Sequence, residues 1–148
     1  MMPFQKILVP TDFSLQSMNA TRLAANLCER YSAALTLLYV HEPVAYELPE
    51  GQVANLPSYL DRLFVEFNQR LADARELAWA AGAHRVDTRL LQGSAKREIV
   101  RFAASFDLLV MGTRGKQGLD RLLSGSLSEH VVQTAPCAVL VVGLQKAT

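Results

Sequence analysis

Residues 107–142, DLLVMGTRGKQGLDRLLSGSLSEHVVQTAPCAVLVV, contain two apolar runs separated by a loop rich in glycine. The first run, Leu108 to Met111, is bounded by Asp107 and Gly112, a pattern typical of a strand buried on both faces of a parallel sheet. The second run, Cys137 to Val142, is equally apolar. We therefore predict a strand, a loop, a short helix and a further strand.

The loop between these strands has the features of an anion site. Glycines have no Cβ, so the backbone can approach a ligand and turn its N–H groups toward it. Ser126 followed by Glu129 fits a capping box, which predicts a helix from Ser126 to Pro136. The N-terminus of that helix would face the loop and suits phosphate. A flexible loop before an ordinary capped helix explains the glycines equally well. Neither a Walker A pattern nor G-x-G-x-x-G occurs, so P-loop and dinucleotide binding lose support.

Strands and helices alternate through the rest of the chain. We expect strands at 6–9, 34–40 and 84–91, and helices at 15–31, from about 57 to 81, and at 95–105. Residues 41–57 hold three prolines and three glutamates and are predicted to form a long irregular connection. In the third strand, apolar and charged residues alternate, which indicates a half-exposed edge of the sheet.

This alternation requires a parallel sheet covered by helices on both faces, and right-handed crossovers leave few topologies. With 148 residues, 50% of them hydrophobic, we predict one domain over residues 1–148. Its five-stranded parallel sheet has the order 3-2-1-4-5, a Rossmann-like fold. Strands 1 and 4 are then neighbours at the switch point, where ligands bind beyond the strand ends. Asp12 and the glycine loop meet in that crevice. Asp12 would bind a ribose, a base or a hydrated magnesium ion, or would bond its own backbone in a turn.

The spacing Gly112-x2-Gly115-x9-Gly125-Ser126 resembles the C-terminal signature of the universal stress protein family. The opening residues 6–14, KILVPTDFS, look like the first strand and the aspartate of that family. The resemblance extends over nearly the whole chain. It implies a fold like that of the adenine nucleotide alpha hydrolases and a homodimer that binds ATP, or AMP or ADP, with or without Mg²⁺.

The crevice and the resemblance together assign one set of residues to the nucleotide: Pro10, Thr11, Asp12, Val40, Met111, Gly112, Arg114, Gly115, Gly125, Ser126, Leu127 and Ser128. In the family pattern, Val40 contacts adenine through its backbone, and the glycines and Ser126 hold the phosphates. Arg114 would pair with outer phosphates or simply be solvated. Leu127 stands where the family often has valine or threonine, and Ser128 would supply the missing hydroxyl.

The fifth strand, Cys137 to Val142, is apolar on both faces but lies at an edge of the predicted sheet. An exposed apolar edge strand invites association. We therefore expect the same strand of a second copy to pair with it about a two-fold axis, and the resemblance implies the same dimer.

The net charge, the lack of a long apolar run and the spacing of cysteines and histidines argue against a nucleic-acid-binding, membrane or metal-binding protein. The net charge of +1 favours neither nucleic acid nor an anionic membrane. No apolar run approaches the length of a membrane span and no leader is legible, so a cytoplasmic protein is expected. Cys28 and Cys137 are expected to be reduced core residues. His41, His84 and His130 lack metal-ligand spacing and are expected at the surface or its boundary, with His41 nearest the crevice.

Three functions stay open. The first is nucleotide-dependent signalling by an ATP-binding homodimer to an unknown protein partner. The second is slow ATP hydrolysis or phosphoryl transfer in the same pocket, for which no catalytic base is legible. The third is a nucleotide-free dimeric interaction module. The fold alone does not identify the process that the protein serves.

Overall fold

The computed structural model describes residues 4–43, 56–113 and 127–143. Their elements alternate along the chain: β1 (Lys6–Pro10), α1 (Leu15–Tyr31), β2 (Ala34–His41), α2 (Leu56–Ala80), β3 (Val86–Gln92), α3 (Ala95–Ala103), β4 (Leu108–Gly112), α4 (Leu127–Thr134) and β5 (Ala138–Val142). The strands form one parallel sheet in the order β3-β2-β1-β4-β5. The predicted five-stranded sheet and its order are therefore confirmed.

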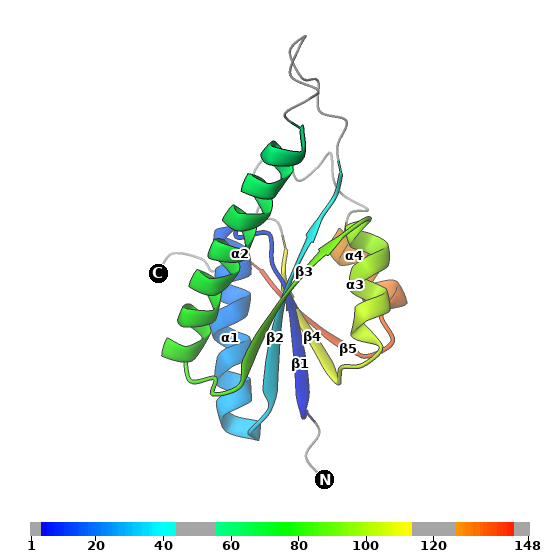
Figure 1. Ribbon diagram of the computed structural model, residues 1–148. Helices are drawn as coiled ribbons and strands as arrows, with labels where there is room; N and C mark the ends of the chain where they lie inside the picture. Colours follow the sequence, from blue (N-terminus) through cyan, green and yellow to red (C-terminus); the bar gives the residue numbers. More distant parts are fainter. Residues whose placement is uncertain (1–3, 44–55, 114–126, 144–148) are drawn as a thin grey trace.

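Two apolar layers sandwich the sheet. Helices α1 and α2 cover one face, and α3 and α4 cover the other (Figure 1). Successive residues of a strand point to opposite faces, so Ile7 and Val9 of β1 join the layer of α1 and α2, and Leu8 joins the layer of α3 and α4. This alternation explains why the central strands are continuously apolar.

Some boundaries differ from the sequence prediction, and pairing between strands explains the clearest case. β2 continues through His41 because it stays in register with β3 up to the pair His41 and Gln92. The Gly93 N–H then donates to the His41 carbonyl at 2.9 Å. At the other end of the long connection, α2 begins at Leu56. The predicted start of α4 at Ser126 lies outside the described residues.

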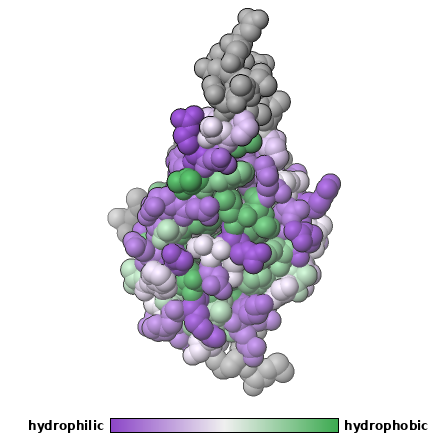
Figure 2. Space-filling view, in the orientation of Figure 1, coloured by the Kyte–Doolittle hydropathy of each residue, from purple (hydrophilic) through white to green (hydrophobic). Residues whose placement is uncertain are grey.

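The third strand forms one edge of the sheet, as its alternating pattern predicted. Figure 2 shows the molecule from this side, with apolar residues gathered in the middle and hydrophilic residues around them. Val86 is buried, while Asp87 and Arg89 are exposed. The Arg89 guanidinium lies 5.4 Å from the centre of the Phe102 ring. Charged side chains on an edge strand oppose pairing with other chains.

Helix α1 approaches the end of β4 closely at Gly112. A Cβ added to Gly112 would lie 2.7 Å from the backbone carbon and oxygen of Gln16. Backbone atoms inside a helix cannot move away as a flexible side chain can. Gly112 therefore allows the first turns of α1 to pack against the end of β4.

Replacing Leu37 with alanine should cost about 2–5 kcal/mol of unfolding free energy, because its side chain is completely buried between the sheet and the helices. Leu15→Ala is the matched control, since Leu15 is 59% exposed. Urea titrations followed by circular dichroism would measure both. Similar losses in the two variants would contradict the described core.

Replacing Gly112 with alanine should destabilise the protein by about 1–3 kcal/mol, the usual cost of forcing an extra carbon into a packed site. Gly143→Ala provides the control, because a Cβ there meets nothing within 4 Å. The denaturation midpoints of the two variants would be compared with that of the unmodified protein. A Gly112→Ala variant as stable as Gly143→Ala would show that α1 does not press on β4.

Candidate functional site

Side-chain hydrogen bonds hold the turn between β1 and α1. Asp12 Oδ1 accepts from Ser17 Oγ at 2.7 Å and from the Ser14 N–H at 3.0 Å. The Asp12 N–H donates to Ser17 Oγ at 3.2 Å. Ser14 Oγ caps α1 by accepting from the Ser17 N–H at 3.2 Å. One oxygen of Asp12 thus forms the turn bond weighed from the sequence, while the residue as a whole remains exposed.

Phe13 turns the chain away from the sheet. Its φ of 65° lies in the left-handed region, which costs a residue with a Cβ roughly 1–2 kcal/mol. The Phe13 N–H donates to Thr11 Oγ1 at 3.0 Å, and Thr11 is only 8% exposed. The Phe13 ring lies 4.8 Å from the Tyr39 ring and 5.6 Å from the Arg70 guanidinium. These contacts offset the cost of the turn.

The backbone groups of β2 alternate between its two neighbouring strands. The Ala34 N–H donates to the Gln5 carbonyl at 2.9 Å. The Leu38 carbonyl accepts from the Thr11 N–H at 2.8 Å. Even-numbered residues of β2 therefore direct their N–H and C=O groups toward β1. Val40 obeys the same alternation.

Val40 extends past the point where β1 stops. In a continued parallel ladder, the donor for the Val40 carbonyl would be the Phe13 N–H. That donor is committed to Thr11 Oγ1 instead, because β1 ends at Pro10 and the chain turns. The Val40 carbonyl is consequently directed past the end of β1.

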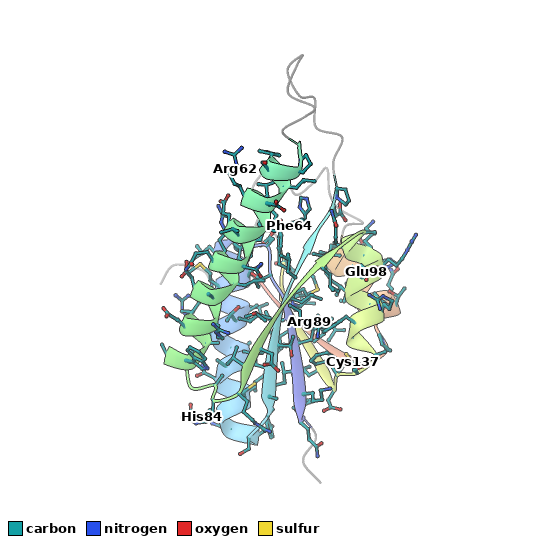
Figure 3. The ribbon with its side chains drawn as sticks, in the orientation of Figure 1. Arg62, Phe64, His84, Arg89, Glu98 and Cys137 are labelled. Atoms are coloured by element: carbon teal, nitrogen blue, oxygen red, sulfur yellow. The ribbon has the colours of Figure 1, made fainter. Side chains whose placement is uncertain are left out.

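An aromatic cluster of Tyr39, His41, Phe64 and Phe67 connects the end of β2 to α2. The Phe67 ring lies 4.7 Å from the Tyr39 ring and 5.1 Å from the His41 ring. Phe64 meets His41 edge-on at 5.7 Å, and Figure 3 shows Phe64 on the inner side of α2. His41 is only 6% exposed, so the expectation of a surface or boundary residue is wrong for it. The aromatic residues of α2 cover its ring.

Two residues that stabilise the ends of helices were missed in the sequence. Ser17 lies three residues after Ser14, and this spacing is the signal that could have revealed it. Glu42 Oε1 accepts from the Ala95 N–H at 2.7 Å and so satisfies the start of α3. Ser94 occupies the N-cap position of α3 but forms no capping bond through its side chain. No local pattern signals Glu42, since it lies 53 residues before Ala95.

The structure brings together part of the predicted nucleotide site. Pro10, Thr11 and Met111 are buried at the ends of β1 and β4, and Gly112 lies under α1. Leu127 and Ser128, both half-buried, open α4. The other predicted residues, Arg114, Gly115, Gly125 and Ser126, lie outside the described part of the chain. The described members of this predicted set therefore lie at the ends of β1, β2 and β4 and at the start of α4.

The described residues contain no cluster of three or more histidines, cysteines, aspartates or glutamates that could hold a metal ion. Cys28 is buried and Cys137 half-buried, and both thiols are free. Burial raises the pKa of Cys28 to about 11, against the smaller opposing effect of Arg85. Burial, and then the charge of Asp107, also raises the pKa of Cys137. Neither thiol is activated as a nucleophile.

Similar proteins agree with this architecture. A universal stress protein of Methanocaldococcus jannaschii is 37% identical over 94% of this chain and 82% of its own length. The solved universal stress protein of Lactobacillus plantarum superimposes with a TM-score of 0.77 at 30% identity, covering 94% of this chain and 97% of its own. A universal stress protein solved with cAMP gives a TM-score of 0.70 at 28% identity, covering 95% and 97% of the two chains.

A family model matches nearly the whole chain. The model of the universal stress protein family matches residues 3–143, which include all five strands of the sheet. No helix among the described residues is long and apolar enough to cross a membrane. By sequence and by fold, the chain belongs to the universal stress protein family.

Proposed function

We propose that the protein binds an adenine nucleotide, with ATP as the physiological ligand, in the crevice beyond β1 and β4. The observation that carries this proposal is the Val40 carbonyl, whose ladder donor is committed to Thr11. A carbonyl at the end of β2 that points past β1 can accept a hydrogen bond from the amino group of a purine. The relative solved with cAMP supports the same ligand class.

Each end of the nucleotide has its own partners in this proposal. The Val40 carbonyl accepts from the 6-amino group of adenine, and Asp12 binds the ribose. The phosphates lie at the start of α4, held by Gly115, Gly125, Ser126 and Arg114. Helix N-termini and glycine-rich loops suit phosphate because their N–H groups and dipoles favour negative charge. Mg²⁺ enters only as the ion carried by the phosphates of ATP.

The group at position 6 of the purine provides the first test of the proposed Val40 contact. ATP and AMP should bind at least ten times more tightly than the inosine nucleotides ITP and IMP, since a 6-keto oxygen would face the Val40 carbonyl and leave it without a donor. Isothermal titration calorimetry with and without Mg²⁺ would measure this ratio. Chromatography of a denatured sample would identify any nucleotide that co-purifies. Equal affinity for ATP and ITP would remove Val40 from base recognition.

The glycine spacing provides the second test. Gly115→Asp should reduce ATP affinity at least a hundredfold, because it adds a side chain and a negative charge where phosphate is proposed to bind. Gly118→Asp is the matched control, since it adds the same charge to the same segment outside the G-x2-G-x9-G-S spacing. Circular dichroism would verify that both variants fold. If both variants bind ATP like the unmodified protein, the phosphates lie elsewhere.

We also propose that the protein acts as a homodimer that signals to a protein partner in the cytoplasm. β5 is an edge strand with Leu140 37% exposed, and Val132 of the adjacent α4 is 54% exposed. Pairing of β5 with its copy about a two-fold axis would cover these apolar groups. The two free thiols are typical of proteins in a reducing compartment.

Leu140→Lys should convert the dimer to a monomer, because it places a charge in the proposed interface. Val65→Lys is the control, since Val65 is 70% exposed on α2, far along the chain from β5. Light scattering coupled to size-exclusion chromatography would give twice the chain mass for the unmodified protein and for Val65→Lys. A dimer that survives Leu140→Lys would place the interface elsewhere.

A further inference from the structure

We propose that Ser17 is a positioning residue for the nucleotide: its hydroxyl orients Asp12 toward the ribose and so sets the affinity of the crevice without touching the ligand. This inference rests on the proposed nucleotide function. Ser17 is not among the residues that the sequence assigns to the nucleotide.

The Ser17 hydroxyl holds Asp12 at two points. It donates to Asp12 Oδ1 at 2.7 Å and accepts from the Asp12 N–H at 3.2 Å. The Ser14 N–H gives the same carboxylate oxygen a second donor at 3.0 Å. Fixing one oxygen and the main chain of a residue fixes its side-chain torsions, and with them the direction of the other oxygen.

Burial of Ser17 protects its hydrogen bonds to Asp12 from competition with water. Ser17 is only 6% exposed, whereas Asp12 is exposed. Water competes poorly for a hydrogen bond whose donor is buried. An exposed aspartate without such a partner would sample several rotamers, and a ligand would have to select one of them. Because Ser17 holds Asp12 in one rotamer before the nucleotide binds, binding does not have to order this side chain.

The hydroxyl is not needed to hold the backbone of α1. The Ser17 N–H has its own acceptor in Ser14 Oγ at 3.2 Å, and the Ser17 carbonyl accepts from Thr21 Oγ1 at 2.8 Å. These bonds survive removal of the Ser17 hydroxyl. The Ser17 hydroxyl also accepts from Ser14 Oγ at 3.3 Å, so its removal affects Ser14 as well as Asp12. The double variant with Asp12→Ala therefore measures how much of the loss acts through Asp12.

The test is a double-mutant cycle with AMP, which carries the adenosine end of the nucleotide without the outer phosphates. Ser17→Ala should weaken AMP binding about 5- to 30-fold, and Asp12→Ala should weaken it at least as much. The double variant should bind no more weakly than Asp12→Ala alone, because Ser17 acts through Asp12. Thr21→Val is the matched control: it removes another buried hydroxyl of α1 and should leave AMP affinity within about twofold.

Amide hydrogen exchange of the free protein gives a second readout, independent of any ligand. Ser17→Ala should remove the protection of the Asp12 N–H while the core amides of α1 stay protected, which also verifies that the variant folds. An unchanged Asp12 amide, an effect of Ser17→Ala below twofold, or additive losses in the double variant would overturn the positioning role and leave nucleotide binding intact. No AMP or ATP binding by the unmodified protein would instead overturn the proposed function, and the positioning role with it.

Discussion

The hydrogen bond from the Phe13 N–H to Thr11 Oγ1 decides where β1 stops pairing with β2. If β1 continued to Phe13, the ladder would satisfy the Val40 carbonyl with that same N–H group. Because a side-chain oxygen takes the donor instead, β2 extends past the end of β1. A local competition for one N–H group therefore leaves the Val40 carbonyl beyond the β1 ladder, where we propose that it contacts a ligand.

The left-handed conformation of Phe13 would be costly in isolation, and the aromatic cluster under α2 explains why it persists. The Phe13 ring contacts Tyr39, and Tyr39 in turn contacts Phe67 of α2. The turn, the end of β2 and α2 are thus one packed unit. The same packing buries His41 and keeps β2 in register with β3 up to the last pair. Packing of the aromatic rings under α2 therefore supports both the left-handed Phe13 turn and the ordered end of β2.

The periodicity of apolar residues predicted the helices and strands, and the strand order predicted that β1 and β4 are neighbours. The same topology predicts that Asp12 and the glycine loop share one crevice, whereas Val40 was assigned from the family resemblance. The sequence did not predict the details in which several groups could form the same hydrogen bond or packing contact. Ser94 precedes α3 and has the right chemistry to cap it, yet Glu42 from a distant loop supplies the acceptor. His41 is polar and follows the strand predicted at 34–40, yet it ends β2 and the aromatic residues of α2 bury it. Such outcomes depend on tertiary packing that no local pattern encodes.

The glycines of the G-x2-G-x9-G-S spacing do not carry equal weight as evidence for phosphate. Gly112 has a sufficient reason in packing, because any Cβ there would meet the backbone of Gln16. A chain that had lost its nucleotide would still need this glycine to seat α1 against β4. Gly115 and Gly125 lie outside the described residues, and the proposed phosphate contacts depend on them. The proposed contact with adenine depends on none of the three glycines, since we argue it from the hydrogen-bond alternation of β2 and the turn at Phe13.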